Sequence, residues 1–197
     1  SLFAELDDLE ARGLPTLNVR VSDRAQILLP IHKQFDALEE ERLGDRAFGS
    51  TKSGIAPFYS DKALKVGVGV DEIFDEGKLA DRLGPIQAVR NRVLQSVYGE
   101  PPVSASELVS HCVAYRDRLE PWVCDTTDLL REIRQFGGRI LLGGQLGALR
   151  DLDHGLHGFS TSSSTLAGYG AVGAGVPPWA ITDIVTVTKA YSSCVGA

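Results

Sequence analysis

The sequence predicts a helix-rich α/β protein that forms the central part of a larger sheet. Amphipathic patterns with the helical period fill the first two-thirds of the chain. Strand-like apolar runs come late, at Arg139–Leu142 and at Ile184–Ala190, where Val and Thr alternate. Two or three strands are few for a complete α/β domain, and the last one runs almost to the final residue. A piece of a larger sheet explains both facts better than an entire fold does.

The first elements follow from apolar periodicity. The first residues are predicted to form a helix, because four apolar residues share one helical face, namely Leu2, Phe3, Leu6 and Leu9. Gly13 is expected to end this helix. Leu17–Val21 has the pattern of a short strand. An amphipathic helix is then expected from Asp23 to about Leu43, and Pro30 is expected to bend it. We interpret its charged end, Glu39–Arg42, as a solvated face.

Later helices are indicated by capping residues and by glycine. Ser60 is expected to cap a short helix, and Thr126 or Thr127 to open a longer one that ends near Gly137. Two further helices are predicted between these points, at about Lys78–Tyr98 and Ser106–Leu119. We therefore treat residues 1–197 as one region, with a helical part of about residues 1–136 and a sheet part of about residues 137–197.

Composition narrows the class of protein. The 197 residues carry a net charge of −6, from 20 basic and 26 acidic side chains, which argues against bulk nucleic-acid binding. No apolar run reaches the roughly 20 residues of a membrane span. The acidic, amphipathic first residues do not form a signal peptide. Three cysteines at wide spacing, Cys112, Cys124 and Cys194, are typical of reduced thiols in a cytoplasmic protein.

Two glycine-containing loops are candidate binding sites. Gly49–Gly54 combines flanking glycines, three hydroxyls and a lysine, which together could donate hydrogen bonds to an anion. It is not a Walker A loop, and on these residues alone a surface turn is the favoured interpretation. Gln145 follows the predicted strand that ends at Leu142, where ligands sit in open α/β sheets. Its amide could contact a base edge, and a structural role is an equal alternative.

Three other motifs receive weaker functional interpretations. Asp151–His154 is a poor metal signal, and a hydrogen-bonded turn before Gly155 is the better prediction. The hydroxyl run Ser160–Thr165 could bind a phosphate at a helix N-terminus, and the segments around it favour a packed loop over a linker. Gly168–Gly173 matches G-x-G-x-x-G, yet no strand leads into it, so we reject dinucleotide binding and expect close packing of small residues.

Three stretches in register resemble one known family. Gly49–Lys62 is similar to the segment G-T-T-x-x-G-I-G-P-x-Y-x-D-K of adenylosuccinate synthetases. Asp151–Gly155 followed by Thr161–Ser163 resembles that family's D-I-D-H-G and T-S-S, and Lys189–Gly196 resembles its K-A-Y-x-T-R-V-G. The likeness covers nearly the whole chain.

The resemblance implies a P-loop-NTPase-like fold and a ligase that forms adenylosuccinate from IMP and L-aspartate with GTP hydrolysis and Mg²⁺. By the same resemblance, Thr51 and Thr161 hold the IMP phosphate and Gln145 contacts the purine. Lys65, where the family has Arg, reaches the partner's IMP site across a homodimer. The backbone of Val195 and Gly196 lies beside the nucleotide.

Departures from the family pattern bear on substrate and activity. Gly143 stands where the family loop E-G-A-Q-G has Glu, Gln145 comes one position early, and Cys194 replaces an arginine. The sequence contains no G-D-E-G-K-G-K loop, so we expect no catalytic or metal-binding residue in this chain and no turnover by the chain alone. A non-catalytic purine-nucleotide-binding module, or a related ligase acting on another purine monophosphate, remains an alternative.

Overall fold

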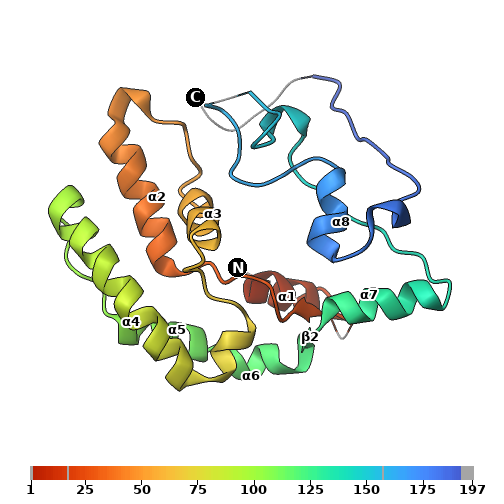
Figure 1. Cartoon of the computed structure of the whole chain (residues 1–197), viewed down its shortest axis with the longest axis horizontal. Coiled ribbons are helices and arrows are strands. Elements are labelled where there is room, and N and C mark those ends of the chain that lie inside the picture. The colour runs from red at the N-terminus through yellow and green to blue at the C-terminus, as the bar shows by residue number, and fades with distance from the viewer. Residues whose placement is uncertain (1, 17, 157, 192–197) are drawn as a thin grey trace.

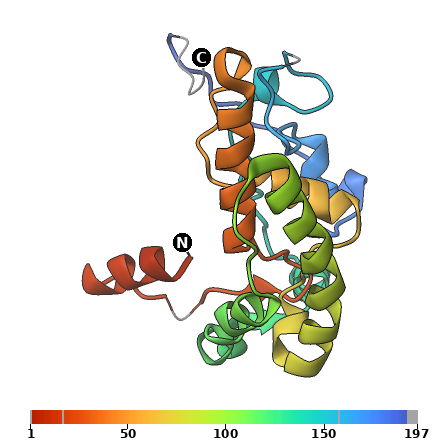
Figure 2. The same cartoon turned by 90° about the vertical axis from the view of Figure 1, so that its left-hand side faces the viewer.

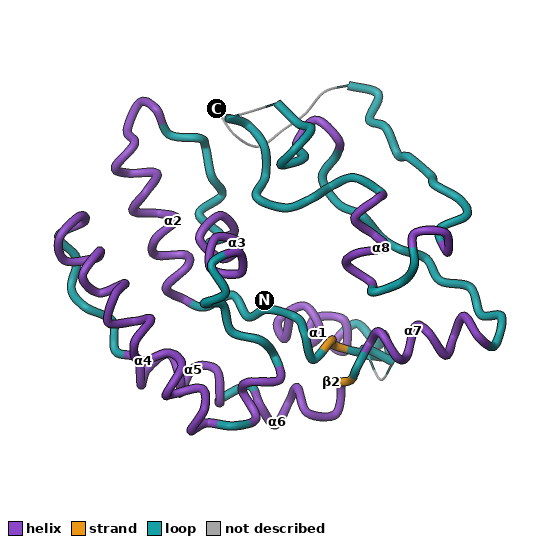
Figure 3. The backbone as a smooth tube through the Cα atoms, viewed as in Figure 1, coloured by secondary structure: helices purple, strands orange, loops and turns teal. Residues whose placement is uncertain are grey.

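Helices dominate the fold, as the amphipathic patterns predict (Figure 1, Figure 3). A computed structural model describes residues 2–16, 18–156 and 158–191. The α-helices are α1 (Leu2–Ala11), α2 (Pro30–Leu43), α3 (Ile55–Ala63), α4 (Glu76–Val93), α5 (Ala105–Val113), α6 (Arg116–Leu119), α7 (Thr126–Gln135) and α8 (Gly168–Ala174). A π-helical turn, Leu94–Tyr98, extends α4. None of the helices described is long and apolar enough to cross a membrane.

The hydrophobic core lies in the first two-thirds of the chain, where α4 packs on α5 and α2 on α3. Its fully buried centre is Ile73, Leu79, Leu83 and Leu94. Each such side chain contributes about 2 kcal/mol by leaving water. Figure 2 shows α1 extending to one side of this body, and the Phe3 ring anchors its start by stacking on Tyr115. Burial raises the pKa of the Cys112 thiol to about 11.

Two predicted helix starts are wrong, each for a local reason. α2 begins at Pro30 and not at Asp23. Proline suits the first helical position, because its missing N–H has no partner there, and it disfavours helix in the residue before it. Ser60 does not open a helix either, since α3 begins at Ile55 and ends at Ala63. The predicted starts near Lys78, Ser106 and Thr126 agree with α4, α5 and α7 to within two residues.

The only sheet among the described residues is a parallel pair of two-residue strands, β1 (Val21–Ser22) and β2 (Val123–Cys124). Val21 pairs with Val123, so the predicted strand at 17–21 survives only at its end.

The later apolar runs, residues 139–142 and 184–190, form no strand. Leu141 is 95% exposed and Val187 is 93% exposed. A strand requires a neighbour for its backbone hydrogen bonds, and the described residues offer these runs none. The strand prediction therefore fails within this chain.

A partly buried carboxylate joins the three helices around the core. Asp61 near the end of α3 accepts hydrogen bonds from Arg90 of α4 and from His32 of α2, with 2.7 Å between His32 Nε2 and Asp61 Oδ2. His32 Nδ1 in turn accepts from the Leu29 N–H at 3.0 Å. These partners define a neutral imidazole whose proton is on Nε2. Burial, followed by the charge of Arg90, lowers the pKa of His32 to about 4.

We predict that the free energy of unfolding falls by about 2 kcal/mol between pH 7 and pH 5 because of His32. The unfolded chain takes up this proton near its ordinary pKa of 6.5 and the folded chain only near 4, so acid favours unfolding within that window. The contribution is complete above pH 6.5. Urea denaturation followed by tryptophan fluorescence at both pH values measures it.

His32→Gln should remove this part of the pH dependence, and His111→Gln, at an exposed histidine, should leave it in place. An undiminished slope in His32→Gln would contradict the assignment.

Candidate functional site

The first candidate loop, residues 48–54, lies between α2 and α3 and is held by two acidic residues of α2. Glu40 accepts hydrogen bonds from the backbone N–H groups of Phe48, Gly49 and Ser50 at 3.0 to 3.1 Å. Asp36 accepts from the Ser50 hydroxyl at 2.8 Å and from the Gly54 N–H at 2.7 Å. Glu40 is thus buried, and its interpretation as part of a solvated face is wrong.

Glycine is required where this loop meets α2. Gly54 has φ +84°, and a Cβ there would lie only 2.8 Å from the backbone nitrogen of Lys33. Thr51 is exposed at the tip of the loop, and its hydroxyl donates to Ser53 Oγ at 2.9 Å. The loop is therefore an ordered structure and not a loose surface turn.

The second candidate loop, residues 147–165, is organised by the buried carboxylate of Asp151. Its Oδ1 accepts from the N–H groups of Asp153 and His154, and its Oδ2 from that of Thr165 at 2.8 Å. These bonds, that of Thr165 first, hold the pKa of Asp151 below its usual range. A side chain at Gly155 would collide with the Asp151 carbonyl. The predicted hydrogen-bonded turn is confirmed.

Ser163 brings two of the predicted site residues together. Gln145 Nε2 donates to Ser163 Oγ at 3.2 Å, and the Thr161 hydroxyl lies 3.3 Å from the same atom. The Thr161 N–H donates to the Arg150 carbonyl at 2.8 Å, which fixes the backbone. Ser163 is buried, whereas Gln145 is exposed. Sequence reasoning treated Ser163 only as one hydroxyl in a run.

Lys65 lies apart from the other predicted residues. It follows α3, whereas Thr51 precedes it, and the side chain is exposed. Arg82 donates to the carbonyls of Lys65 and Gly67 and so fixes this segment. Lys65 lines a hollow of about 420 Å³ together with three other cations, Arg24, Lys62 and Arg82, and two acidic residues, Asp71 and Glu72.

Backbone strain marks the same three places. The non-glycine residues with left-handed φ within 2–16, 18–156 and 158–191 are Lys52, Lys65 and Leu146. Each is a predicted site residue or the neighbour of one. Such conformations cost about 1 to 3 kcal/mol and are concentrated at functional sites.

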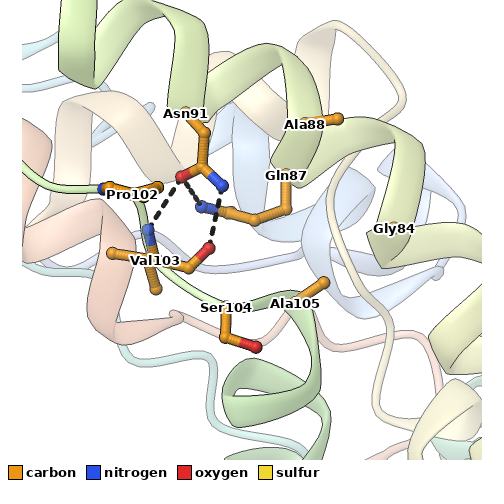
Figure 4. A pocket seen from close by; sticks show the side chains of 8 residues that line it. All are labelled: Gly84, Gln87, Ala88, Asn91, Pro102, Val103, Ser104 and Ala105. Carbon is orange, nitrogen blue, oxygen red and sulfur yellow. Dashed lines mark hydrogen bonds between the residues drawn. The ribbon is translucent and has the colours of Figure 1, made fainter.

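Two predicted site residues cannot be placed, and a second hollow lies away from the predicted site residues. Val195 and Gly196 lie outside the described residues. A hollow of about 340 Å³ between α4 and residues 102–105 contains no predicted site residue (Figure 4). There the Asn91 side chain bonds to both the N–H and the carbonyl of Val103, which tethers that segment to the helix. Within the described part of the chain, no group of three or more His, Cys, Asp or Glu could hold a metal ion.

The entire chain is similar to one family of known proteins. The sequence profile described as adenylosuccinate synthetase matches residues 1–197. The adenylosuccinate synthetase of Corynebacterium glutamicum (strain R) is 40% identical over 197 residues, which are 100% of this chain and 46% of that protein. That of Heliobacterium modesticaldum is 39% identical over 195 residues, again 46% of its length. The chain thus spans about half the length of these curated relatives.

A solved structure confirms the fold. The structure titled fully ligated adenylosuccinate synthetase from Plasmodium falciparum superposes with a TM-score of 0.85 and 23% identity, over 98% of this chain and 46% of that one. At this identity the likeness establishes the fold alone. Because the family profile covers every residue, the chain belongs to the adenylosuccinate synthetase family.

Proposed function

We propose that the protein containing this chain is a GTP-dependent ligase that forms adenylosuccinate from IMP and L-aspartate in the cytoplasm, and that this chain carries much of the IMP site. The observation that carries the proposal is the Gln145–Ser163–Thr161 cluster, which places an amide beside a hydroxyl on a backbone fixed by Asp151. An amide suits a purine edge, and hydroxyls and backbone N–H groups suit a phosphate.

The roles follow from the family resemblance, and for the described residues they suit the chemistry of each group. The Thr161 and Thr51 hydroxyls donate to the 5′-phosphate, and Gln145 contacts the base. Val195 and Gly196 approach the nucleotide with their backbone. The family resemblance implies that Mg²⁺ and GTP are held mainly by parts of the relatives' length beyond this chain.

The position of Lys65 supports a homodimer. Thr51 precedes α3 and Lys65 follows it, and the Lys65 side chain is exposed. Lys65 shares its hollow with three further cations, Arg24, Lys62 and Arg82, and with two acidic residues, Asp71 and Glu72. We infer that this exposed lysine meets the phosphate of a partner subunit, as the family resemblance implies. Lysine keeps the charge of the family's arginine but loses the bidentate fork.

One observation favours a second candidate, a related ligase for another purine monophosphate. The Gln145 amide donates to Ser163 Oγ, and the next residue, Leu146, has φ +68°. The amide group therefore belongs to a loop whose local backbone differs from an ordinary strand end. Gly143, in the same loop, leaves open space where the family pattern has Glu.

We predict that Thr161→Ala weakens IMP binding by the full-length protein about tenfold, the usual effect of losing one hydrogen bond to a charged group. Isothermal titration calorimetry with IMP, and with GMP and inorganic phosphate as comparators, measures this effect. Thr182→Ala, at an exposed threonine whose hydroxyl bonds only to Asp183 within the described residues, is the matched control. Unchanged IMP affinity in Thr161→Ala would refute the phosphate role. Tighter binding of GMP than of IMP would favour the second candidate.

We also predict that two weakened variants restore each other. At IMP concentrations well below the Kd, Lys65→Ala and Thr161→Ala should each lower the rate at both sites of their own homodimer about tenfold. In a mixed dimer, one site combines an intact Thr161 with the partner's intact lysine. Random exchange of subunits should then restore roughly a quarter of the wild-type rate of adenylosuccinate formation, because half the dimers are mixed and each has one good site. Either variant incubated alone is the control, and no recovery on mixing would exclude a shared site.

A further inference from the structure

Two buried carboxylates on α2 receive their hydrogen bonds from the loop of residues 48–54 that follows the helix. Asp36 is 6% exposed and Glu40 is 9% exposed, and they lie one helical turn apart. Buried carboxylates require hydrogen-bond donors or cations. Neither forms an ion pair within the described part of the chain, and their donors are four backbone N–H groups and the Ser50 hydroxyl, all from residues 48–54.

This arrangement determines which groups of the loop stay available. The N–H groups of residues 48, 49, 50 and 54 point inward to the carboxylates, and that of Lys52 donates to Ser50 Oγ at 3.1 Å. The N–H groups of Thr51 and Ser53 have no partner among the described residues. Their two hydroxyls lie 2.9 Å apart at the exposed tip. The loop thus presents two amides and two hydroxyls from one short segment.

The position of the loop is also restricted sterically. Gly54 lies so close to the start of α2 that a Cβ would be 2.8 Å from the Lys33 nitrogen. Lys52 is held with φ +53°, which costs free energy unless the surrounding contacts enforce it. Asp36 and Glu40 supply such contacts on both sides of the tip.

We propose that Asp36 and Glu40 are positioning residues for nucleotide phosphate binding, because they hold residues 48–54 so that the Thr51 and Ser53 amides and hydroxyls meet the phosphate. This proposal rests on the proposed function, in which Thr51 contacts that phosphate. It adds Ser53 to the site and assigns a role to two acidic residues that do not touch the ligand.

The substitution Glu40→Gln separates the effect of the Glu40 charge on IMP affinity from the effect of loop position, because the two change the affinity in opposite directions. Glu40→Gln removes a negative charge near the phosphate, so a purely electrostatic effect would tighten IMP binding. It also replaces one acceptor oxygen by an NH₂ group, which cannot accept from the N–H groups of residues 48–50. Loss of loop position should therefore weaken IMP binding.

The test compares IMP and GTP binding by calorimetry in the full-length protein. Glu40→Gln should raise the Kd for IMP about tenfold and change the Kd for GTP less than twofold. Glu41→Gln, at the exposed neighbour on the same helix, should change neither. Asp36→Asn should also raise the Kd for IMP without changing the Kd for GTP. This second variant replaces Glu40→Gln in the test if circular dichroism shows Glu40→Gln to be unfolded. Ser53→Ala should weaken IMP without changing the fold.

The possible results separate the two proposals. An IMP affinity in Glu40→Gln equal to or tighter than wild type would overturn the positioning role, as would an equal loss of IMP and GTP binding. A wild-type protein that binds GTP but not IMP would instead overturn the proposed function, and the positioning role with it.

Discussion

The hydrogen bonding of buried carboxylates is the interaction on which the arrangement of this chain depends. Asp61 accepts from His32 and Arg90 and so joins α2, α3 and α4. Asp36 and Glu40 bind the loop after α2, and Asp151 binds the loop of residues 147–165. Asp36, Glu40 and Asp151 are buried and Asp61 is partly buried, so each carboxylate requires donors. In the two loops the backbone supplies most of these donors, whereas the donors to Asp61 are side chains. The two candidate loops are therefore built around internal acids, and the Thr51 and Ser53 hydroxyls lie at the exposed tip of the first loop.

The helices could be predicted from the sequence because their signals are local. Apolar period, caps and glycine located α1, α4, α5 and α7. The predicted starts at Asp23 and Ser60 were wrong, the first because Pro30 suits a first helical position. The strands could not be predicted in the same way, because pairing is a non-local property. Residues 184–190 have β-branched composition and still form no strand where no neighbour is present. The same composition in a complete sheet would pair.

The candidate site was predicted in part, and mainly through the resemblance. The turn at Asp151 followed from the sequence, since an Asx turn is local. The bridge through Ser163 depends on folding that brings residue 145 to residue 163, which no spacing rule gives. Glu40 was missed because it stands between Glu39 and Glu41. The spacing along the helix could have indicated its burial. His32, Asp36 and Glu40 recur every four residues and so share one helix face, and all three are buried.

The unpaired runs at residues 139–142 and 184–190 have a consequence for biosynthesis. The buried residues of the main hydrophobic cluster lie between Phe3 and Leu119, and Trp122 and Val123 pack against it. The helical body can therefore close once about that length has left the ribosome. The two apolar runs emerge afterwards with nothing in the described chain to pair with them. Apolar segments with unpaired backbone groups are targets for chaperones and for association with other nascent chains. Rapid pairing of these runs would therefore favour the yield of folded protein.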